Sequence, residues 1–148
     1  MSIFNSFNAA SSALTAQRLR MDVISSNIAN AETTRAEKNA DGTFEPYRRK
    51  MVQLQADKPV FSKFLQDASA NQASGVKVSS ITKDDEPFKM VYNPSHPDAD
   101  ANGYVEMPNV DPLKEMVDLM SATRSYEANV TSLNATKAML MKALEIGK

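Results

Sequence analysis

The chain has 148 residues, enough for one ordinary domain, but only 7% are aromatic and none is Trp. A single core would therefore be modest, and a compact enzyme-like fold is not the default expectation. The 17 basic and 18 acidic residues leave a formal charge of -1, which excludes the basic footprint of most nucleic-acid-binding proteins, and the lack of Cys excludes disulfides and cysteine nucleophiles.

The start of the chain lacks the features of a secretory signal peptide. No basic residue precedes Arg18, and no continuous apolar core of seven or more residues is present. No apolar run approaches the length of a membrane span either. By these conventional signals we expect a soluble, cytoplasmic chain, and any work outside the cytoplasm would require another route of export.

The first thirty residues, rich in Ala, Ser and Asn, predict an amphipathic helix. Apolar side chains recur at intervals of seven, and two more widen the stripe. These positions are Phe7, Leu14, Met21 and Ile28, with Phe4 and Ile24 beside them. A helix with so narrow an apolar stripe is weak alone, so we expect it to pack against a partner helix.

The middle of the chain predicts a small β domain with a mobile loop near residues 58–75. Short alternating runs at residues 47–55, 75–79, 88–92 and 104–107 are typical of strands. In the third run, Phe88, Met90 and Tyr92 would share one face.

The end of the chain predicts a second long helix. Asp111 is suited to be its N-cap and Pro112 its first residue, and Gly147 would stop it after Ile146. Apolar residues along it recur at spacings of three, four and seven. They are Met116, Leu119, Tyr126, Val130, Leu133, Leu140 and Leu144.

Together these patterns predict an α+β fold. The long N- and C-terminal helices would pair as a coiled-coil-like hairpin, with the small β domain between them. The expected divisions are an N-terminal assembly helix and turn at residues 1–35, a central β-rich domain at 36–110 and a C-terminal assembly helix at 111–148.

Two groups of polar residues invite a chemical interpretation. His96, Asp98 and Asp100 alternate as metal ligands can, but the surrounding prolines and Asn102-Gly103 favour a turn in which the Asp side chains bond their own backbone. The basic run RRK at residues 48–50 favours a solvated strand edge over a phosphate-binding patch, and DD at 84–85 a solvated loop. We therefore expect no catalytic residue, metal site or cofactor.

Two terminal motifs carry a resemblance to a known family. The run SNIANA at residues 26–31, followed by Thr33 and preceded by Arg20-Met21, resembles the N-terminal signature of flagellar rod and hook proteins. The run RSYEAN at residues 124–129 resembles their C-terminal signature. The segment at 93–111 is similar to that of the short, proximal rod members, whereas Glu32 departs from the small or amide residue that the family often has.

The resemblance implies a structural rod subunit that transmits torque from motor to hook and filament. Its partners would be other flagellar rod proteins, copies of itself in a helical assembly and the flagellar type III export apparatus, with no nucleic acid and no direct membrane insertion. It would be located in the periplasmic rod of the basal body and exported without a cleavable signal peptide. Asn27 and Asn30 would bond backbone groups at the end of the first helix, and Tyr126 and Asn129 would pack and hydrogen-bond across subunits.

The residues expected at subunit contacts lie on the two terminal helices. They are Phe7, Leu14, Met21, Ile24, Asn27, Ile28, Asn30, Leu119, Arg124, Tyr126, Glu127, Asn129, Val130, Leu133, Leu140 and Leu144.

Two other classes of function remain open at the level of sequence. One is a helical adaptor or export-related protein that binds one defined partner in a closed complex. The other is a metal-dependent enzyme at His96. A rod subunit differs from both because it joins an open axial structure.

Overall fold

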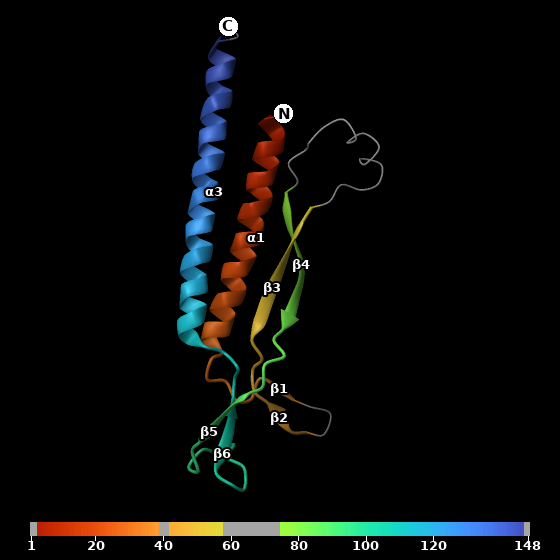
Figure 1. Ribbon diagram of the computed structural model, residues 1–148, viewed down its shortest axis with the longest axis vertical. Helices are drawn as coiled ribbons and strands as arrows, with labels where there is room; N and C mark the ends of the chain where they lie inside the picture. The colour runs from red at the N-terminus through yellow and green to blue at the C-terminus, as the bar shows by residue number, and fades with distance from the viewer. Residues whose placement is uncertain (1–2, 39–41, 58–74, 147–148) are drawn as a thin grey trace. The chain divides into compact units, whose positions relative to one another are not determined.

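The computed structural model describes residues 3–38, 42–57 and 75–146, and side chains within the first helix from residue 6 onward. Its elements in chain order are α1 (Ile3–Ala29), β1 (Glu37–Lys38), β2 (Phe44–Glu45), β3 (Lys50–Ala56), β4 (Val76–Lys83), β5 (Lys89–Tyr92), β6 (Tyr104–Met107) and α3 (Pro112–Ile146) (Figure 1). Two long helices and small strand pairs confirm the α+β class. Residues 58–74 of the loop expected near 58–75, the stop at Gly147 and the side chain of Phe4 lie outside the described residues.

Local hydrogen bonds end α1 where the sequence predicts. The backbone N–H of Asn30 donates to the Ser26 carbonyl at 3.1 Å, and Asn30 Nδ2 donates to the same oxygen at 2.8 Å. An amide side chain at this position satisfies a carbonyl that has no partner further along the helix. Asn30 therefore bonds the backbone at the helix end, as expected.

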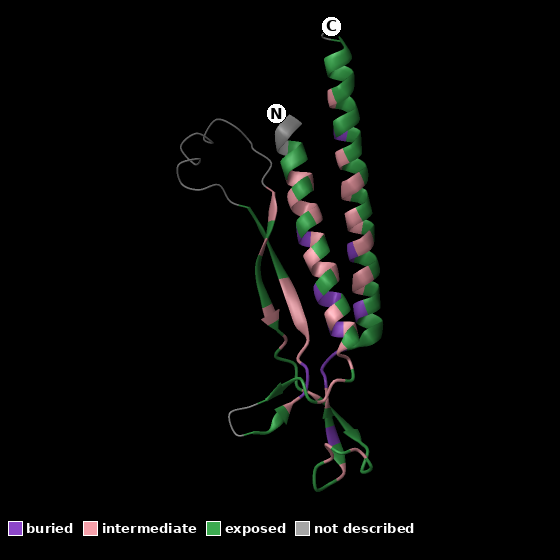
Figure 2. Ribbon diagram, turned by 180° about the vertical axis from the view of Figure 1, so that it is seen from behind, coloured by how far each residue is buried: buried purple, intermediate pink, exposed green. Residues whose placement is uncertain are grey.

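The most deeply buried positions of α1 do not form the predicted heptad seam. Phe7 is exposed, and Leu14, Met21 and Ile28 are only half-buried. The buried residues of α1 instead lie on another stripe, visible as purple bands in Figure 2. They are Ala16, Val23, Ile24 and Asn27, of which Ile24 belongs to the apolar stripe that the sequence predicted. The seven-residue repeat was found from large apolar side chains. The buried positions include the small Ala16 and the amide Asn27, which a hydrophobicity pattern does not identify.

The strands form three separate two-stranded sheets, which pair β1 with β2, β3 with β4, and β5 with β6. The first and last pairs are antiparallel, with Glu37 opposite Glu45 and Val91 opposite Val105. The β6 strand matches its predicted bounds, β3 begins three residues later than expected, and β4 continues beyond residue 79 to Lys83. The short β1–β2 pair was not predicted.

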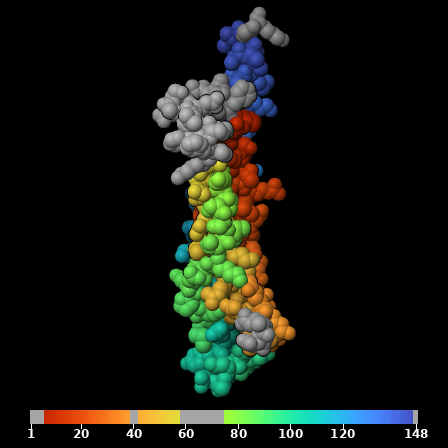
Figure 3. Space-filling view, turned by 90° about the vertical axis from the view of Figure 1, so that its right-hand side faces the viewer, coloured from red at the N-terminus to blue at the C-terminus, as the bar shows by residue number. Residues whose placement is uncertain are grey.

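Most strand residues lie on the surface. Five of the eight positions in β4 are exposed, and the strand is visible in green in Figure 3. All four residues of β5 are exposed, including Met90 and Tyr92, whose alternation places them on one face of the strand. In the β5–β6 pair the buried side chain is Val105 of β6.

The N-terminus of α3 follows its sequence prediction. Asp111 Oδ1 accepts the backbone N–H of Leu113 at 3.0 Å, and the Asp111 carbonyl accepts the N–H of Glu115 at 3.0 Å. Asp111 is therefore the N-cap, and Pro112 occupies the first helical position, where a missing N–H costs nothing.

The residues group into two compact units, each assembled from distant parts of the sequence. Unit 1 comprises Met1–Met21, Val52–Ser80 and Met120–Lys148, and unit 2 comprises Asp22–Met51 and Ile81–Leu119. Across the described residues, neither helix combines the length and apolarity that crossing a bilayer requires.

Within unit 1, a close approach ties β4 to α1. Ser12 Oγ accepts the backbone N–H of Val76 at 3.0 Å and donates to the Ala9 carbonyl at 2.8 Å. A Cβ on Gly75 would lie 2.6 Å from Ser12 Oγ, so only glycine allows this approach without displacement.

Candidate functional site: a buried polar junction and an exposed helix face

The end of α1 carries a buried amide that connects three segments of unit 2. Asn27, 1% exposed, receives at Oδ1 the N–H of Lys50 and the hydroxyl of Tyr47, each at 3.0 Å. Its Nδ2 donates to the Lys50 carbonyl and to Glu115 Oε2, each at 2.9 Å. One side chain thus satisfies both backbone groups at the start of β3 and bonds the first turns of α3.

A buried ion pair adjoins this amide. Glu115 is fully buried, and its Oε1 accepts Arg49 Nε at 2.6 Å. The other guanidinium nitrogens of Arg49 lie 3.3 Å from Asp84 Oδ2 and 3.6 Å from Asp118 Oδ2. A carboxylate enclosed in this way requires its partners, since removing one partner of a buried pair typically costs about 3–5 kcal/mol.

Asn109 extends this hydrogen-bonded network to backbone groups. Its Oδ1 accepts the N–H of Arg49 at 2.8 Å, and its Nδ2 donates to the Glu86 carbonyl at 3.1 Å. The Asp84 N–H in turn donates to the Arg49 carbonyl at 2.8 Å. We name Asn27, Tyr47, Arg49, Asp84, Asn109 and Glu115 together the polar junction.

The charges of the polar junction are mutually stabilised. The backbone N–H of Glu86 and then Arg49 hold the pKa of the Asp84 carboxyl below its ordinary value, against burial, which raises it. Burial alone would lower the pKa of Arg49, but hydrogen bonds and charge from Glu115 and Asp84 raise it above the ordinary value. The junction therefore holds a charged, hydrogen-bonded network that fixes positions, and it offers no nucleophile next to a general base.

This junction corrects two sequence-based expectations. Arg49 is not part of a solvated strand edge, because its side chain is 13% exposed and paired with buried or half-buried carboxylates. Asp84 is likewise not in a solvated loop, being 14% exposed and bonded to Arg49. Neighbouring Arg48 lies over the Phe88 ring at 4.3 Å. The charged runs at residues 48–50 and 84–85 predicted solvent exposure, because their partners are brought near only by the tertiary structure.

The first turns of α3 present an apolar face that no described part of the chain covers. Leu113 is 74% and Val117 is 59% exposed, and Met116 and Met120 are also exposed. Spacings of three, four and seven place these four residues on one side of the helix, opposite the buried Glu115 and Ala122. We call Leu113, Met116, Val117 and Met120 the α3 apolar face.

The predicted contact residues of α3 divide into two groups by burial. Half-buried positions are Leu119, Tyr126, Asn129, Val130, Leu133 and Leu140, while Arg124, Glu127 and Leu144 are exposed. Asn129 Nδ2 donates to the Ser125 carbonyl one turn earlier, at 2.8 Å. Apart from Met116 and Leu144, which are exposed, the predicted apolar positions of α3 are half-buried within the chain.

Of the predicted contact residues, Asn27 makes four side-chain hydrogen bonds within the chain, to Lys50, Tyr47 and Glu115. The α3 apolar face was missed except for Met116, although the run LKEMVDLM carries apolar residues on both sides of the helix. A helix apolar on both sides is typical of burial on both sides.

The segment around His96 is a turn, as its composition favoured. Asp98 accepts Arg35 Nε at 2.8 Å and the Thr34 hydroxyl at 2.9 Å, and its N–H donates to His96 Nδ1. Asp100 Oδ1 accepts the N–H groups of Asn102 and Tyr104, and Gly103 adopts φ +81°. Within the described ranges, no three His, Cys, Asp or Glu side chains are grouped to hold a metal ion.

Comparisons with known proteins give family matches that include most of α1 and all of α3. Residues 7–36 match the family described as flagella basal body rod protein, and residues 101–146 match the C-terminal region of the flagellar basal body rod FlgEFG proteins. The flagellar basal-body rod protein FlgC of Bacillus subtilis is 64% identical over 151 aligned positions that cover 100% of both chains.

The chain belongs to the FlgC family of flagellar basal-body rod proteins. The FlgC of Salmonella typhimurium is 46% identical over 149 positions, again covering 100% of both chains, and that of Borreliella burgdorferi is 47% identical over 154 positions, covering 99% and 98%. FlgC proteins are structural components of the rod, so the chain is a structural rod subunit and not an enzyme.

Proposed function

We propose that this FlgC-family chain polymerises through its terminal helices and thereby transmits torque along the rod. The α3 apolar face carries this proposal. Burying four large apolar side chains that the chain itself leaves exposed would favour association, since burial of one such side chain contributes about 1.5–3 kcal/mol. The natural occupant of such a face in a rod is the helix of a neighbouring subunit.

The two helices would also pair within the subunit as a coiled-coil-like hairpin. In unit 1, the Thr123 hydroxyl donates to Met21 Sδ at 3.6 Å, and in unit 2 Asn27 bonds Glu115. Each bond joins α1 to α3, which supports pairing along both helices. The half-buried residues Leu14, Leu133 and Leu140 would complete this pairing together with helices of neighbouring subunits.

The remaining predicted residues have matching roles in this proposal. Arg124, Glu127 and Leu144 would contact neighbours from exposed positions, and Tyr126 would pack between subunits from its half-buried one. Asn27 and Asn30 would act indirectly, by fixing the end of α1 that adjoins these contacts.

Assembly of this kind would be open rather than closed. A contact between different surfaces of identical copies repeats without limit and produces a filament. Such a subunit would reach the periplasmic rod through the flagellar type III export apparatus without a cleaved signal peptide, and it would bind other rod proteins as well as copies of itself.

The test is a charged substitution on the α3 apolar face. Val117→Asp replaces a side chain that is 59% exposed in the subunit, so the free energy of unfolding should change by only about 0.5 kcal/mol. In the rod, the same charge would be buried without a partner, at a cost of several kcal/mol. We expect a normal soluble level, at least about tenfold lower recovery in purified basal bodies and loss of motility.

The matched control is Ser132→Asp, which adds the same charge at an exposed position on a different side of α3. It should incorporate better than Val117→Asp. Normal incorporation of Val117→Asp would contradict polymerisation through this face. Recovery of the wild-type chain only in a closed complex of fixed stoichiometry would instead support an adaptor.

A further inference from the structure

The two compact units of the chain carry opposite charge. Unit 1 contains nine Lys and Arg and four Asp and Glu, a formal charge of +5. Unit 2 contains eight Lys and Arg and 14 Asp and Glu, a formal charge of -6. The overall charge of -1 conceals this division, because the charge of -6 lies within residues 81–119, whereas residues 22–51 are neutral and the three segments of unit 1 are each positive.

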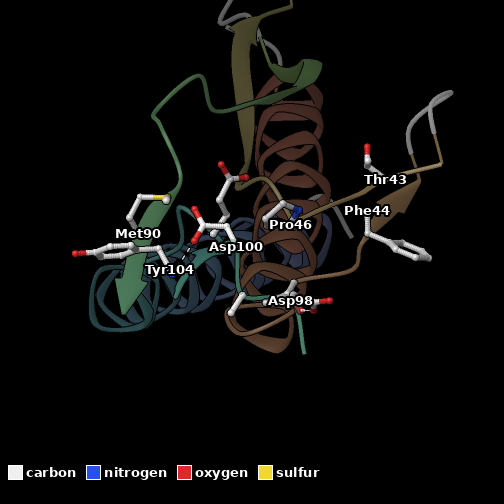
Figure 4. A pocket seen from close by; sticks show the side chains of 10 residues that line it. Thr43, Phe44, Pro46, Met90, Asp98, Asp100 and Tyr104 are labelled. Atoms are coloured by element: carbon white, nitrogen blue, oxygen red, sulfur yellow. Dashed lines mark hydrogen bonds between the residues drawn. The ribbon is translucent and has the colours of Figure 1, made fainter. Parts of the chain in front are cut away.

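Unit 2 contains a groove of about 380 Å³ with apolar walls and an acidic rim. Its lining includes Met90 and Tyr104 from the β5–β6 pair and Phe44 and Pro46 from β2 and the residue after it, and Figure 4 shows the Tyr104 and Phe44 rings pointing away from each other. Its carboxylates are Asp98, Asp100 and Glu106.

The apolar walls of this groove face solvent in the subunit. Phe44, Met90 and Tyr104 are all exposed, at 43% or more. Tyr104 is held in place by Tyr92, which meets it edge to face at a centroid distance of 5.3 Å. A rigid, exposed aromatic surface beside carboxylates suits a cation that carries an apolar stem, as Lys and Arg do.

The chain itself shows how these groups bind a cation. Arg35 pairs with Asp98 through Nε at 2.8 Å while its guanidinium lies 5.5 Å from the centre of the Phe44 ring. The pKa of Asp98 is lowered by the hydrogen bonds from Arg35 and Thr34, so this carboxyl is charged and already engaged. Glu106, exposed on β6, also lines the groove and could meet a second cation.

We propose that this groove docks unit 1 of a second copy of the chain, taking a Lys or Arg side chain between Glu106 and the Tyr104 ring. This inference rests on the proposed rod assembly. It adds an electrostatic attraction between unit 2 of one copy and unit 1 of the next, which would orient successive copies. Contact of the acidic unit of one copy with the basic unit of the next is heterologous, and the opposite orientation would bring like charges together. Exposed cations available on unit 1 include Arg18, Lys77 and Lys137.

The first experiment compares two charge reversals in unit 2. Glu106→Lys lies in the groove, whereas Asp85→Lys makes the same change of charge at an exposed position outside it. We expect Glu106→Lys to lower recovery in purified basal bodies by about fivefold or more, because a reversed charge repels its former partner, and Asp85→Lys to stay within about twofold of wild type.

The second experiment restores the contact within one polypeptide. Since every copy would present both surfaces, Glu106→Lys combined with Arg18→Glu, Lys77→Glu or Lys137→Glu pairs the reversed charges between neighbours. At least one of these double variants should recover to within about twofold of wild type. If none does, or if Glu106→Lys incorporates as well as Asp85→Lys, the inference is wrong.

A third measurement identifies the occupant directly. The chain has no Cys, so a single Glu106→Cys substitution allows selective bismaleimide cross-linking in assembled basal bodies. Paired with copies carrying Arg18→Cys, Lys77→Cys or Lys137→Cys, it should give a dimer of this chain, whereas Asp85→Cys should not. Cross-linking only to another rod protein would overturn the second copy as occupant. If Val117→Asp blocks incorporation and Glu106→Lys does not, the docking proposal for the groove is wrong but polymerisation through the helices still holds. If both variants incorporate normally, both proposals are wrong.

Discussion

Replacing Asn27 by Ala should destabilise the subunit more than any other single amide substitution on α1. The change removes four hydrogen bonds, to the N–H and carbonyl of Lys50, to Glu115 and to the Tyr47 hydroxyl. Net contributions of about 1 kcal/mol per bond give about 4 kcal/mol. The buried Glu115 carboxylate would also lose one of its two donors.

Asn30→Ala is the matched control, because it removes the same amide three residues later. Asn30 is half-buried and makes two side-chain bonds, donating to the Ser26 carbonyl and accepting the Thr33 hydroxyl, so its loss should cost about 1–2 kcal/mol, less than that of Asn27. Urea unfolding of the full-length variants, followed by far-UV circular dichroism, measures both values. For a chain of this size, a loss of 4 kcal/mol corresponds to a fall in Tm of about 10 °C.

Equal losses in the two variants would refute the reasoning that the polar junction organises the subunit. An Asn27→Ala chain of unchanged stability that fails to enter basal bodies would show that Asn27 acts between subunits instead. The two roles are separated because the unfolding experiment uses the unassembled chain.

Two further predictions concern acid stability and the turn. The pKa of Asp84 is lowered in the folded chain, so the stability it contributes is present above its unfolded pKa, about 4, and is lost as pH falls through the lower folded value. Asp84→Asn should therefore be less stable than wild type at pH 7, with a difference that shrinks towards pH 3; a constant difference in pH-dependent unfolding would count against pairing with Arg49. His96→Ala should change the free energy of unfolding by about 1 kcal/mol or less and leave swimming intact, since the His96 side chain accepts one hydrogen bond within the turn, from the Asp98 N–H. Loss of swimming together with a stoichiometric bound metal would contradict the turn interpretation.

The sequence alone determined the features that depend on local bonding. The N-cap at Asp111 followed by Pro112, the amide of Asn30 at the end of α1 and the turn that closes into β6 all depend on bonds within a few residues. Residue type and spacing specify such bonds, because the chain cannot place the partners elsewhere. The two terminal motifs also sufficed to indicate the family.

Only the tertiary structure decided which polar groups became buried and which apolar groups stayed exposed. Asn27 and Glu115 are 88 residues apart in sequence, and nothing local marks either as a partner of the other. Arg49 and Asp84 resembled solvated charges because a charge pattern does not reveal a distant partner. The heptad of α1 likewise predicted a helix but not its most buried stripe, since burial depends on what packs against each side of the helix and not on its periodicity alone.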